Sequence, residues 1–318
     1  MSSLKTGIIL LNMGGPSTLE QVRPFLYNLF SDRDIIPLGP KLLQKPIAWI
    51  IAKKRAPKSM ATYKLIGGGS PLQKITRMQA AALADSLKED GNFVADIAMR
   101  YWPPYSTETV QNMIDDGVQR IIALSLYPHY SKATTGSSLK HLRAAITKID
   151  KDIPLVEIPF WPTQKSYVQA IATNIEEARD NFGHDCEIVY SAHSLPVSFI
   201  EEGDPYLEHT KQTIEAIEAL TTIKGRLCFQ SRSGPVEWLT PSTPDTLTEM
   251  ANEGCKKVII VPISFVSDHV ETLYEIDIEY KELAESLGMQ LHSCTSLNTQ
   301  PLFIKALREL ILENTEKF

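Results

Sequence analysis

The sequence lacks any apolar run of the ~20 residues that a membrane-spanning helix needs. The first apolar run after Lys5 extends only from Ile8 to Leu11 and ends at Asn12. That run is also too short for the apolar segment of a signal peptide. We therefore expect a cytoplasmic protein.

Cysteine is scarce as well. The four cysteines, Cys186, Cys228, Cys255 and Cys294, are far apart in the sequence, and no Cys-x-x-Cys pair occurs. Many zinc and redox sites use such pairs, and disulfides are rare in reducing compartments. We therefore interpret the cysteines as small apolar residues rather than as metal ligands or disulfide partners.

The common phosphate-binding motifs are missing. The segment 12–16 (NMGGP) follows the first expected strand, where a dinucleotide-binding protein would carry Gly-x-Gly-x-x-Gly, and the segment 67–71 (GGGSP) lacks the P-loop lysine. The second segment fits a helix start, with Ser70 as N-cap, Pro71 in the first turn and Gln73 completing a capping box. A helix N-terminus also favours an anion, so a carboxylate site at Ser70 is the alternative interpretation.

The sequence has no excess of positive charge, because 32 Lys and Arg residues are outnumbered by 38 Asp and Glu residues and the net charge is −6. A general nucleic-acid binder usually needs a basic balance, so we expect no nucleic-acid partner. The stretch 41–58 nevertheless carries six basic residues and no acidic one, beside large apolar residues such as Leu42, Trp49 and Ile50. Taken alone, this stretch predicts a helix on a membrane surface.

Short apolar runs alternate with amphipathic stretches along the 318 residues, of which 43% are apolar and 22% charged. Strands are expected at 7–12, 93–99, 119–126, 154–158, 187–192, 226–231, 257–263 and 289–294. Helices are expected at 18–29, 71–88, 106–116, 135–149, 164–181, 205–222, 243–253, 269–287 and 300–315. Near-continuous apolar strands that alternate with helices indicate parallel sheets covered on both faces.

The eight expected strands divide four and four near residue 160, where Pro159, Trp161 and Pro162 occur together. This pattern predicts an α/β fold with two similar doubly wound lobes, each with a four-stranded parallel sheet. The lobes are expected over 1–162 and 163–299, and the final helix at 300–318 is a candidate to pack back on the first. An eight-stranded barrel is the competing topology.

Polar and aromatic residues gather where the expected strands end, which is where ligands bind in open α/β sheets. They include Met13, Arg100, Tyr101, Tyr127, His193, Gln230, Trp238, Asp268, His269 and Glu271. Both lobes are therefore expected to face one cleft. Its lining suits a large flat aromatic ligand better than a sugar or a phosphate.

Two of these residues have both a structural and a chemical interpretation. His193 is either a hydrogen-bonded structural residue or a proton acceptor, because imidazole titrates near neutral pH. Glu271 fits a capping box with Asp268. It also begins a series with Glu275 and Glu279 at intervals of four residues. Such a series is an ordinary solvated face if exposed, or a row of hard oxygen ligands for a divalent cation if it faces the cleft.

Seven segments, in chain order, carry a resemblance to one family. They are LLNMGGP (10–16), YKLIGGGSPL (63–72), MRYWPP (99–104), LSLYPHYSKATTGSS (124–138), YSAHSLP (190–196), CFQSRSGPVEWL (228–239) and SFVSDHVETLYEID (264–277). In addition, EGDPY (202–206) follows YSAHSLP as it does in the signature of the family. With these segments the chain resembles the ferrochelatases over essentially its whole length. The resemblance implies two flavodoxin-like chelatase lobes that insert Fe²⁺ into protoporphyrin IX to form protohaem, with loss of two pyrrole protons from a distorted macrocycle.

The resemblance also implies roles for individual residues. His193 and Glu271 correspond to the catalytic pair, and Asp268, His269 and Glu275 join them as residues that handle the metal. The resemblance implies substrate contacts for Met13, Arg55, Tyr63, Ser70, Arg100, Tyr101, Gln230 and Trp238. The strand-end pattern adds Tyr127 to this set.

Two departures from the family bear on cofactors and partners. No cysteine follows Cys294, and Lys132 stands where cluster-bearing relatives have a cysteine, so we expect no iron–sulfur cluster and no tightly bound cofactor. The C-terminal extension of the mitochondrial enzymes is missing, so we expect a monomer. The expected partners are protoporphyrin IX and Fe²⁺, with peripheral membrane contact through the lysines of 41–58.

Other substrates stay open, namely coproporphyrin with Fe²⁺ or a corrin precursor with Co²⁺. Met13 favours protoporphyrin, as does an apolar lip expected at Phe25, Leu26, Leu29 and Phe30. Residues 42–51 are expected to belong to the same lip over the porphyrin cleft. A haem carrier with the same fold is the alternative from a different class. The presence of both His193 and Glu271 argues against a carrier.

Overall fold

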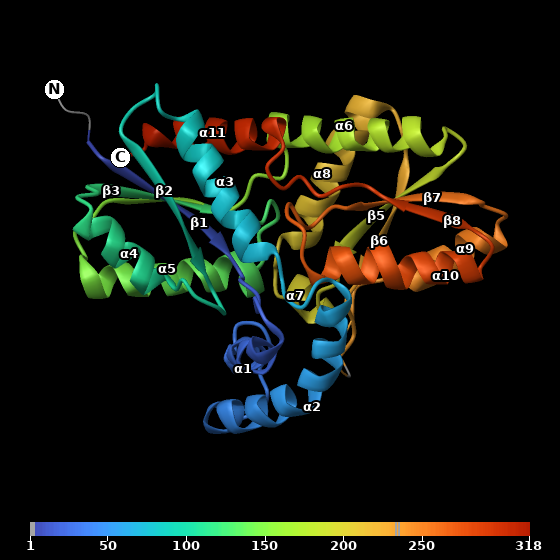
Figure 1. Cartoon of the computed structure of the whole chain (residues 1–318), viewed down its shortest axis with the longest axis horizontal. Helices are drawn as coiled ribbons and strands as arrows, with labels where there is room; N and C mark the ends of the chain where they lie inside the picture. Colours follow the sequence, from blue (N-terminus) through green and yellow to red (C-terminus); the bar gives the residue numbers. More distant parts are fainter. Residues whose placement is uncertain (1–3, 233, 235) are drawn as a thin grey trace. The chain divides into compact units, whose positions relative to one another are not determined.

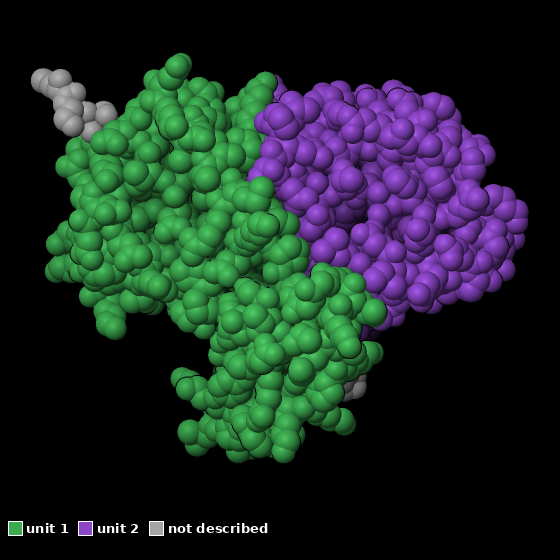
Figure 2. Space-filling model, in the orientation of Figure 1, with its two compact units in different colours: residues 1–161, 304–318 green, residues 162–303 purple. Residues whose placement is uncertain are grey.

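Two four-stranded parallel sheets are the framework of the computed structural model, which describes residues 4–232, 234 and 236–318. The chain forms two compact units, shown in different colours in Figure 2: residues 1–161 with 304–318 (unit 1) and residues 162–303 (unit 2). Residues 1–3 of the expected first lobe and residues 233 and 235 of the motif at 228–239 lie outside the described residues.

The two sheets have the same strand order. Unit 1 contains β1 (Thr6–Asn12), β2 (Phe93–Met99), β3 (Arg120–Ser125) and β4 (Leu155–Ile158) in the order β2-β1-β3-β4. Unit 2 contains β5 (Glu187–His193), β6 (Gly225–Gln230), β7 (Lys257–Pro262) and β8 (Gln290–Ser293) in the order β6-β5-β7-β8. All eight expected strands are present, and two separate sheets rule out the eight-stranded barrel.

Helices cover both faces of the sheet in unit 1. Figure 1 shows α3 (Leu72–Ser86) and α11 (Pro301–Thr315) on one side, with α4 (Ser106–Asp115) and α5 (Ser137–Ile149) on the other. Arg308 links α11 to the chain just after α3, because its guanidinium lies 2.7 Å from the carboxylate of Asp90. Because both faces are covered, all seven residues of β1 are buried, which explains its uninterrupted apolar sequence.

Unit 2 is covered in the same way. Helices α6 (Lys165–Phe182) and α8 (Tyr206–Thr221) lie on one face of its sheet, and α9 (Thr243–Asn252) and α10 (Lys281–Ser286) lie on the other (Figure 1). Val189, Val258 and Ile260 of the strands pack with Leu247 and Met250 of α9 in the core on that second face. The five-residue α7 (Val197–Glu201) was not among the expected helices.

A helical arm extends from unit 1 (Figure 1). It consists of η1 (Leu19–Gln21), α1 (Val22–Ser31), η2 (Lys41–Leu43) and α2 (Gln44–Leu65). The 22-residue α2 overlaps the stretch 41–58, where the sequence predicts a helix on a membrane surface, although it is not among the helices expected from the alternation with strands. Ala48, Ala52 and Ala56 are buried at intervals of four residues along α2, and α1 packs closely against this helix. Its inward stripe is therefore made of small residues.

The expected apolar lip is wrong for three of its residues, which lie on α1. Phe25, Leu26 and Phe30 of α1 are 5, 9 and 5% exposed, because they lie inside the arm rather than on its surface. The exposed apolar residues of the arm come from the other part of the expected lip, on η2 and α2, where Leu42 is 92% and Ile50 is 59% exposed. No helix in the described ranges is long and apolar enough to span a membrane.

Each unit has a π-helix after its third strand. In unit 1 it is η3 (Lys132–Gly136), five residues long, which leads into α5. In unit 2 it is η4 (Glu271–Tyr280), ten residues long, which leads into α10. The expected helix at 269–287 is thus a π-helix over most of its length. Segments of this rare type frequently occur at functional sites.

Candidate active site

His193 and Glu271 face each other in unit 2. His193 is the last residue of the central strand β5, and Glu271 is the first residue of η4. The Nδ1 atom of His193 lies 2.9 Å from Oε2 of Glu271, and the two side chains are 33% and 21% exposed. The carboxylate can only accept from this ring nitrogen, so Nδ1 carries the proton and Nε2 is left to exchange one.

The charges of this pair shift both pKa values in the direction of an ion pair. Enclosure alone lowers the pKa of His193, but the negative charges of Glu271 and Glu275 outweigh it, so the pKa lies above its ordinary value. Burial alone raises the pKa of Glu271, but contact with His193 and the nearby His269 hold it well below its usual range. The pair therefore stabilises the imidazolium that forms when Nε2 of the neutral His193 ring takes up a proton.

Glu275 brings a second carboxylate to the same cluster. Its Oε2 accepts hydrogen bonds from Gln230 at 3.0 Å and from Ser231 at 2.5 Å. Burial and the neighbouring charge of Glu271 raise the pKa of Glu275 to about 7. Glu275 therefore changes its protonation state near neutral pH, whereas an ordinary glutamate is ionised there. Glu279, the third member of the series, is exposed.

Gln230 holds this cluster together from the end of β6. Its side-chain amide donates to Glu275 and to the main-chain carbonyl of Glu271, 3.1 Å away, and its carbonyl accepts from Ser191 at 2.7 Å. Gln230 is only 1% exposed. This position suits support of the carboxylates better than the substrate contact expected from the sequence.

The capping box expected between Asp268 and Glu271 does not form. The N–H of Asp268 donates to the side chain of Asn298 instead, and the Asn298 amide donates to Asp268 Oδ2 at 2.8 Å. The carboxylate of Glu271 is thereby left to His193. Between the two alternatives for Glu271, the geometry favours the chemical one.

His269 lies next to the pair but is buried, with 5% exposure. Its Nδ1 lies 3.1 Å from the carbonyl of Ser267, and its Nε2 lies 3.6 Å from Glu271 Oε2. Among the described residues this Nε2 atom has no hydrogen-bond partner. Within the same residues, no group of three or more His, Cys, Asp and Glu side chains is arranged to hold a metal ion. The five residues expected to handle the metal therefore do not form a ready-made chelate.

Unit 1 gathers a different cluster at the matching strand end. Arg100, just after β2, lies 2.8 Å from Asp32 Oδ2, and its Nε donates to Ser137 at 2.7 Å. Tyr101 and Ser137 donate to the same carboxylate oxygen at 2.8 and 2.6 Å. Burial alone raises the pKa of Asp32, but these donors and the charge of Arg100 outweigh it and keep that pKa low. Asp32 and Ser137 were not among the expected site residues.

The ferrochelatase family profile matches residues 5–315. The chain belongs to the ferrochelatase family. A ferrochelatase from Desulfotalea psychrophila is 64% identical over 316 residues, which cover 99% of each chain. One from Geotalea uraniireducens is 48% identical, covering 96% of this chain and 97% of that relative. One from Picosynechococcus is 43% identical and covers 98% of this chain and 83% of the relative.

Solved structures agree at the level of the fold. SirB from Bacillus subtilis, solved with Fe³⁺, gives a TM-score of 0.58 at 12% identity, covering 99% of this chain and 98% of that one. DR2241 from Deinococcus radiodurans, described as similar to chelatases, gives 0.51 at 11% identity, covering 98% of this chain and 55% of that one. At these identities the likeness concerns the fold alone.

Two glycine-rich segments of the ferrochelatase resemblance, far apart in sequence, lie together in unit 1. The N–H of Ser70 donates to the carbonyl of Pro16 at 2.7 Å, and a Cβ at Gly69 would approach the Ser17 carbonyl oxygen to 2.2 Å. Only glycine fits at 69. The Oγ of Ser70 accepts from the N–H of Leu72 at 3.3 Å, as expected of an N-cap. The capping box is wrong, because Gln73 bonds Ser17 and Pro103 instead. The N–H of Ser70 is likewise engaged by protein rather than by an anion.

The other residues that the resemblance assigns to the substrate differ in accessibility. Met13, Tyr127 and Trp238 are half-buried, and Arg55 is exposed on α2 with its guanidinium 5.5 Å from the centre of the Phe30 ring. Tyr63 and Tyr101 are only 6 and 3% exposed. The indole N–H of Trp238 has no hydrogen-bond partner in the part of the chain that the structure describes.

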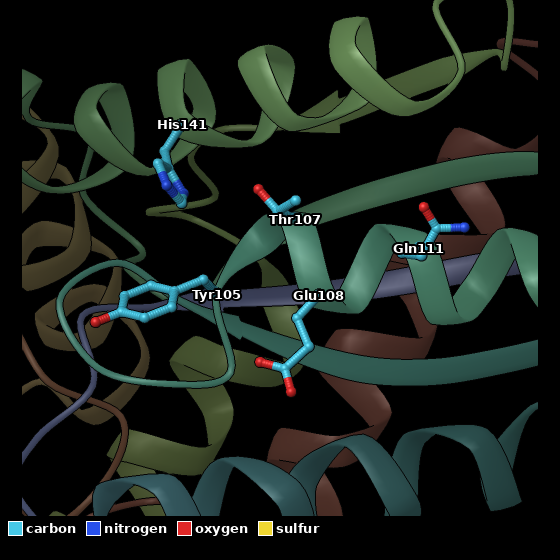
Figure 3. A pocket seen from close by; sticks show the side chains of 5 residues that line it. All are labelled: Tyr105, Thr107, Glu108, Gln111 and His141. Carbon is cyan, nitrogen blue, oxygen red and sulfur yellow. The ribbon is translucent and has the colours of Figure 1, made fainter.

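A pocket of about 630 Å³ in unit 1 contains none of the expected site residues. Figure 3 shows its lining, with Tyr105, Thr107, Glu108 and Gln111 at or on α4 and His141 on α5. A smaller cavity of about 190 Å³ in unit 2 is lined in part by Asp268, Thr272 and Asp277, and so includes one expected residue. The cleft expected between the lobes stays a prediction.

Proposed function

We propose that this chain inserts Fe²⁺ into protoporphyrin IX to form protohaem, with His193 and Glu271 as the catalytic pair. The observation that carries the proposal is the 2.9 Å contact between His193 Nδ1 and Glu271 Oε2 in a chain of the ferrochelatase family. The contact fixes the tautomer of the imidazole and leaves Nε2 to accept a proton. The two domains that serve this reaction are unit 1 and unit 2.

The reaction must remove two pyrrole protons as the metal enters the macrocycle. His193 Nε2 takes the first, and a base works best when its pKa lies near the operating pH. Glu275, whose pKa is raised to about 7, is the second group in the cluster that can hold a proton there. His193 and Glu275 together therefore provide capacity for both protons, and Glu271 keeps the imidazolium stable between the two steps.

The metal is a substrate, so its binding has to be reversible. Carboxylate oxygens and imidazole nitrogen bind Fe²⁺, and Glu271, Glu275, His193 and His269 supply these atoms. Asp268 is tied to Asn298 and orients the start of η4. A loose arrangement of ligands favours delivery, whereas a closed chelate would hold the ion back.

The substrate contacts divide between the units. In unit 1 we assign macrocycle contact to Met13 and Tyr127, and the propionate side to Arg55, Tyr63 and Ser70. Arg100 and Tyr101 act there as a pair whose orientation is fixed by Asp32. In unit 2 we assign macrocycle contact to Trp238, which is half-buried.

The relatives at 43–64% identity are all named ferrochelatase, which favours iron and protoporphyrin over cobalt and a corrin precursor. The test is insertion by the purified protein. Protoporphyrin IX or coproporphyrin is supplied with Fe²⁺ or Zn²⁺, and the Soret band is followed. We expect faster insertion with protoporphyrin. Absence of insertion with either porphyrin would refute the proposal, and preference for coproporphyrin would change the substrate.

Peripheral membrane contact through the arm is a second part of the proposal. Trp49 and Ile50 are 49 and 59% exposed, and Lys53 lies 5.3 Å from the centre of the Trp49 ring. Large apolar groups among lysines suit an anionic lipid surface. Protoporphyrin, an apolar substrate, partitions into such a surface.

Vesicle binding tests this contact. The variant with Lys41, Lys45, Lys53 and Lys54 changed to Gln should lose binding to vesicles of anionic lipid, since each lysine near the surface contributes about 1 kcal/mol. The matched control changes four exposed lysines elsewhere, Lys148, Lys151, Lys211 and Lys281, and should bind normally. No binding by the unaltered protein would remove this part of the proposal.

A further inference from the structure

The main chain of His193 is paired with a neighbouring strand on only one of its two sides. Strand β5 pairs with β6 up to His193, but its pairing with β7 stops at Ser191 and Pro262. Ile263 donates to the carbonyl of Ser191 on the β7 side, and Ser194 donates to Gln230 on the β6 side. Because successive residues of a strand bond to opposite sides, the N–H and C=O of His193 point toward the β7 side, where no strand partner remains.

Two hydroxyl groups take the place of that missing partner. The N–H of His193 donates to Ser264 Oγ at 3.2 Å, and the hydroxyl of Tyr206 donates to the carbonyl of His193 at 2.8 Å. The two hydroxyl oxygens are 2.6 Å apart. Tyr206 and Ser264 are 6 and 5% exposed, so solvent hardly reaches this arrangement.

The direction of every hydrogen bond in this ring is determined. An N–H group can only donate and a carbonyl can only accept, so the Tyr206 proton goes to His193 and the Ser264 oxygen receives from His193. The proton of Ser264 is then the one that joins the two hydroxyls, and it points to the oxygen of Tyr206. These directions give a closed ring of three hydrogen bonds. Buried networks in which every group is satisfied are rigid.

Tyr206 reaches this ring from a defined position. It is the first residue of α8, and its N–H donates to the side chain of Asp204 at 3.1 Å. Ser264 follows β7 by two residues. The ring therefore connects the end of β5, the start of α8 and the turn after β7 at His193, whose side chain faces Glu271.

We propose that Tyr206 and Ser264 are positioning residues that hold the His193 imidazole against Glu271 by clamping the His193 main chain. This inference rests on the proposed function, because it supposes that His193 is the base. Both hydroxyls contact the main chain of His193, so their effect on the reaction passes through its backbone. A displacement of a reacting group by ~1 Å can cost ~100-fold in rate.

The test removes each hydroxyl and keeps the packing. In Tyr206→Phe and Ser264→Ala we expect kcat for metal insertion to fall about tenfold or more, with the porphyrin KM within about twofold of the unaltered value. The double variant should be little worse than either single one, because a ring fails as a unit. In Ser264→Ala the His193 amide should also exchange its hydrogen faster, since it loses its acceptor.

Tyr190→Phe is the matched control. Tyr190 lies on β5, is fully buried, and its hydroxyl has no hydrogen-bond partner among the described residues. This variant should keep the unaltered kcat. A normal kcat in Tyr206→Phe and Ser264→Ala, or an equal loss in Tyr190→Phe, would overturn the inference. Absence of insertion by the unaltered protein would instead overturn the proposed function, and amide exchange would still report whether the clamp exists.

Discussion

The two units place different chemistry on the same framework. Their sheets share one strand order, with β1 and β5 at equivalent central positions. Asn12 ends β1 and His193 ends β5, while Arg100 follows β2 and Gln230 ends β6. Ser137 begins the helix after η3, and Glu271 begins η4. At these strand ends, and in the segments that follow the third strands, the two units differ in the kind of side chain and in what it can do.

The balance of charge separates the two clusters. In unit 1 the single carboxylate of Asp32 faces Arg100 and receives hydrogen bonds from Tyr101 and Ser137, so its charge is fully compensated. In unit 2 two carboxylates share one imidazole, so a negative charge remains uncompensated. The first cluster stays in one protonation state near neutral pH, whereas the second changes state there. The comparison shows that the strand ends position the side chains in both units, and that the uncompensated charge makes only the unit 2 cluster able to exchange protons near neutral pH.

The strongest test of this comparison is the removal of the base in unit 2. His193→Ala should lower metal insertion by about 100- to 10,000-fold, which is the range expected for a general base. Porphyrin binding, measured by fluorescence quenching, should persist. The control His184→Ala alters an exposed histidine of the same unit, with a side chain 67% exposed, and should retain full activity. A turnover near the unaltered value in His193→Ala would assign the base elsewhere.

The second test asks whether the unit 1 cluster has mainly a structural role. Asp32→Asn leaves Arg100 partly buried without its counter-charge, so the free energy of unfolding should fall by about 2 kcal/mol. Urea denaturation measures the change. Asp34→Asn is the control, because its partner Lys140 is 71% exposed and such pairs contribute under about 1 kcal/mol. Equal stability losses in the two variants would contradict the assignment.

The third and smallest effect concerns Glu275. The unfolded chain releases this proton near its ordinary pKa of 4.5 and the folded chain near 7, so stability falls as pH rises through that window. Glu275→Gln removes the cost and should stabilise the protein by about 1–2 kcal/mol at pH 8 but hardly at all near pH 4. Glu279→Gln, on the exposed side of η4, should change little at either pH. Thermal unfolding at the two pH values measures the stability of Glu275→Gln relative to the unaltered protein. If the pKa of Glu275 were not raised, this difference would be the same at both pH values.

Much of the framework could be predicted from the sequence, because buried parallel strands read as continuous apolar runs. All eight strands are present on that basis. The arm shows where the rule fails. Helix α2 buries the small residues Ala48, Ala52 and Ala56 and exposes the large apolar residues Trp49 and Ile50. An ordinary amphipathic helix buries its large apolar residues, so this sequence does not show the usual amphipathic pattern. The lip expected at Phe25 and Phe30 was wrong for a different reason, because α1 buries its large apolar residues as an ordinary amphipathic helix does.

The candidate site was only partly predictable. The residue types at the strand ends indicated His193 and Glu271, but only the structure distinguishes a capping box from a carboxylate that faces the imidazole. Asp32 carried no signal, because a single aspartate after a helix is common. The burial of Tyr101 and Gln230 could not be predicted either, since it depends on partners 69 and 39 residues away, Asp32 and Ser191.

The two π-helices also bear on the origin of the two units. A local irregularity of this kind follows the third strand in both units, five residues long in one and ten in the other. If the units descend from one duplicated half, the irregular turn was present before the copies diverged. Divergence then had only to lengthen it in one copy and place Glu271 and Glu275 along it. The reactive cluster would be a late addition to an old distortion of the backbone.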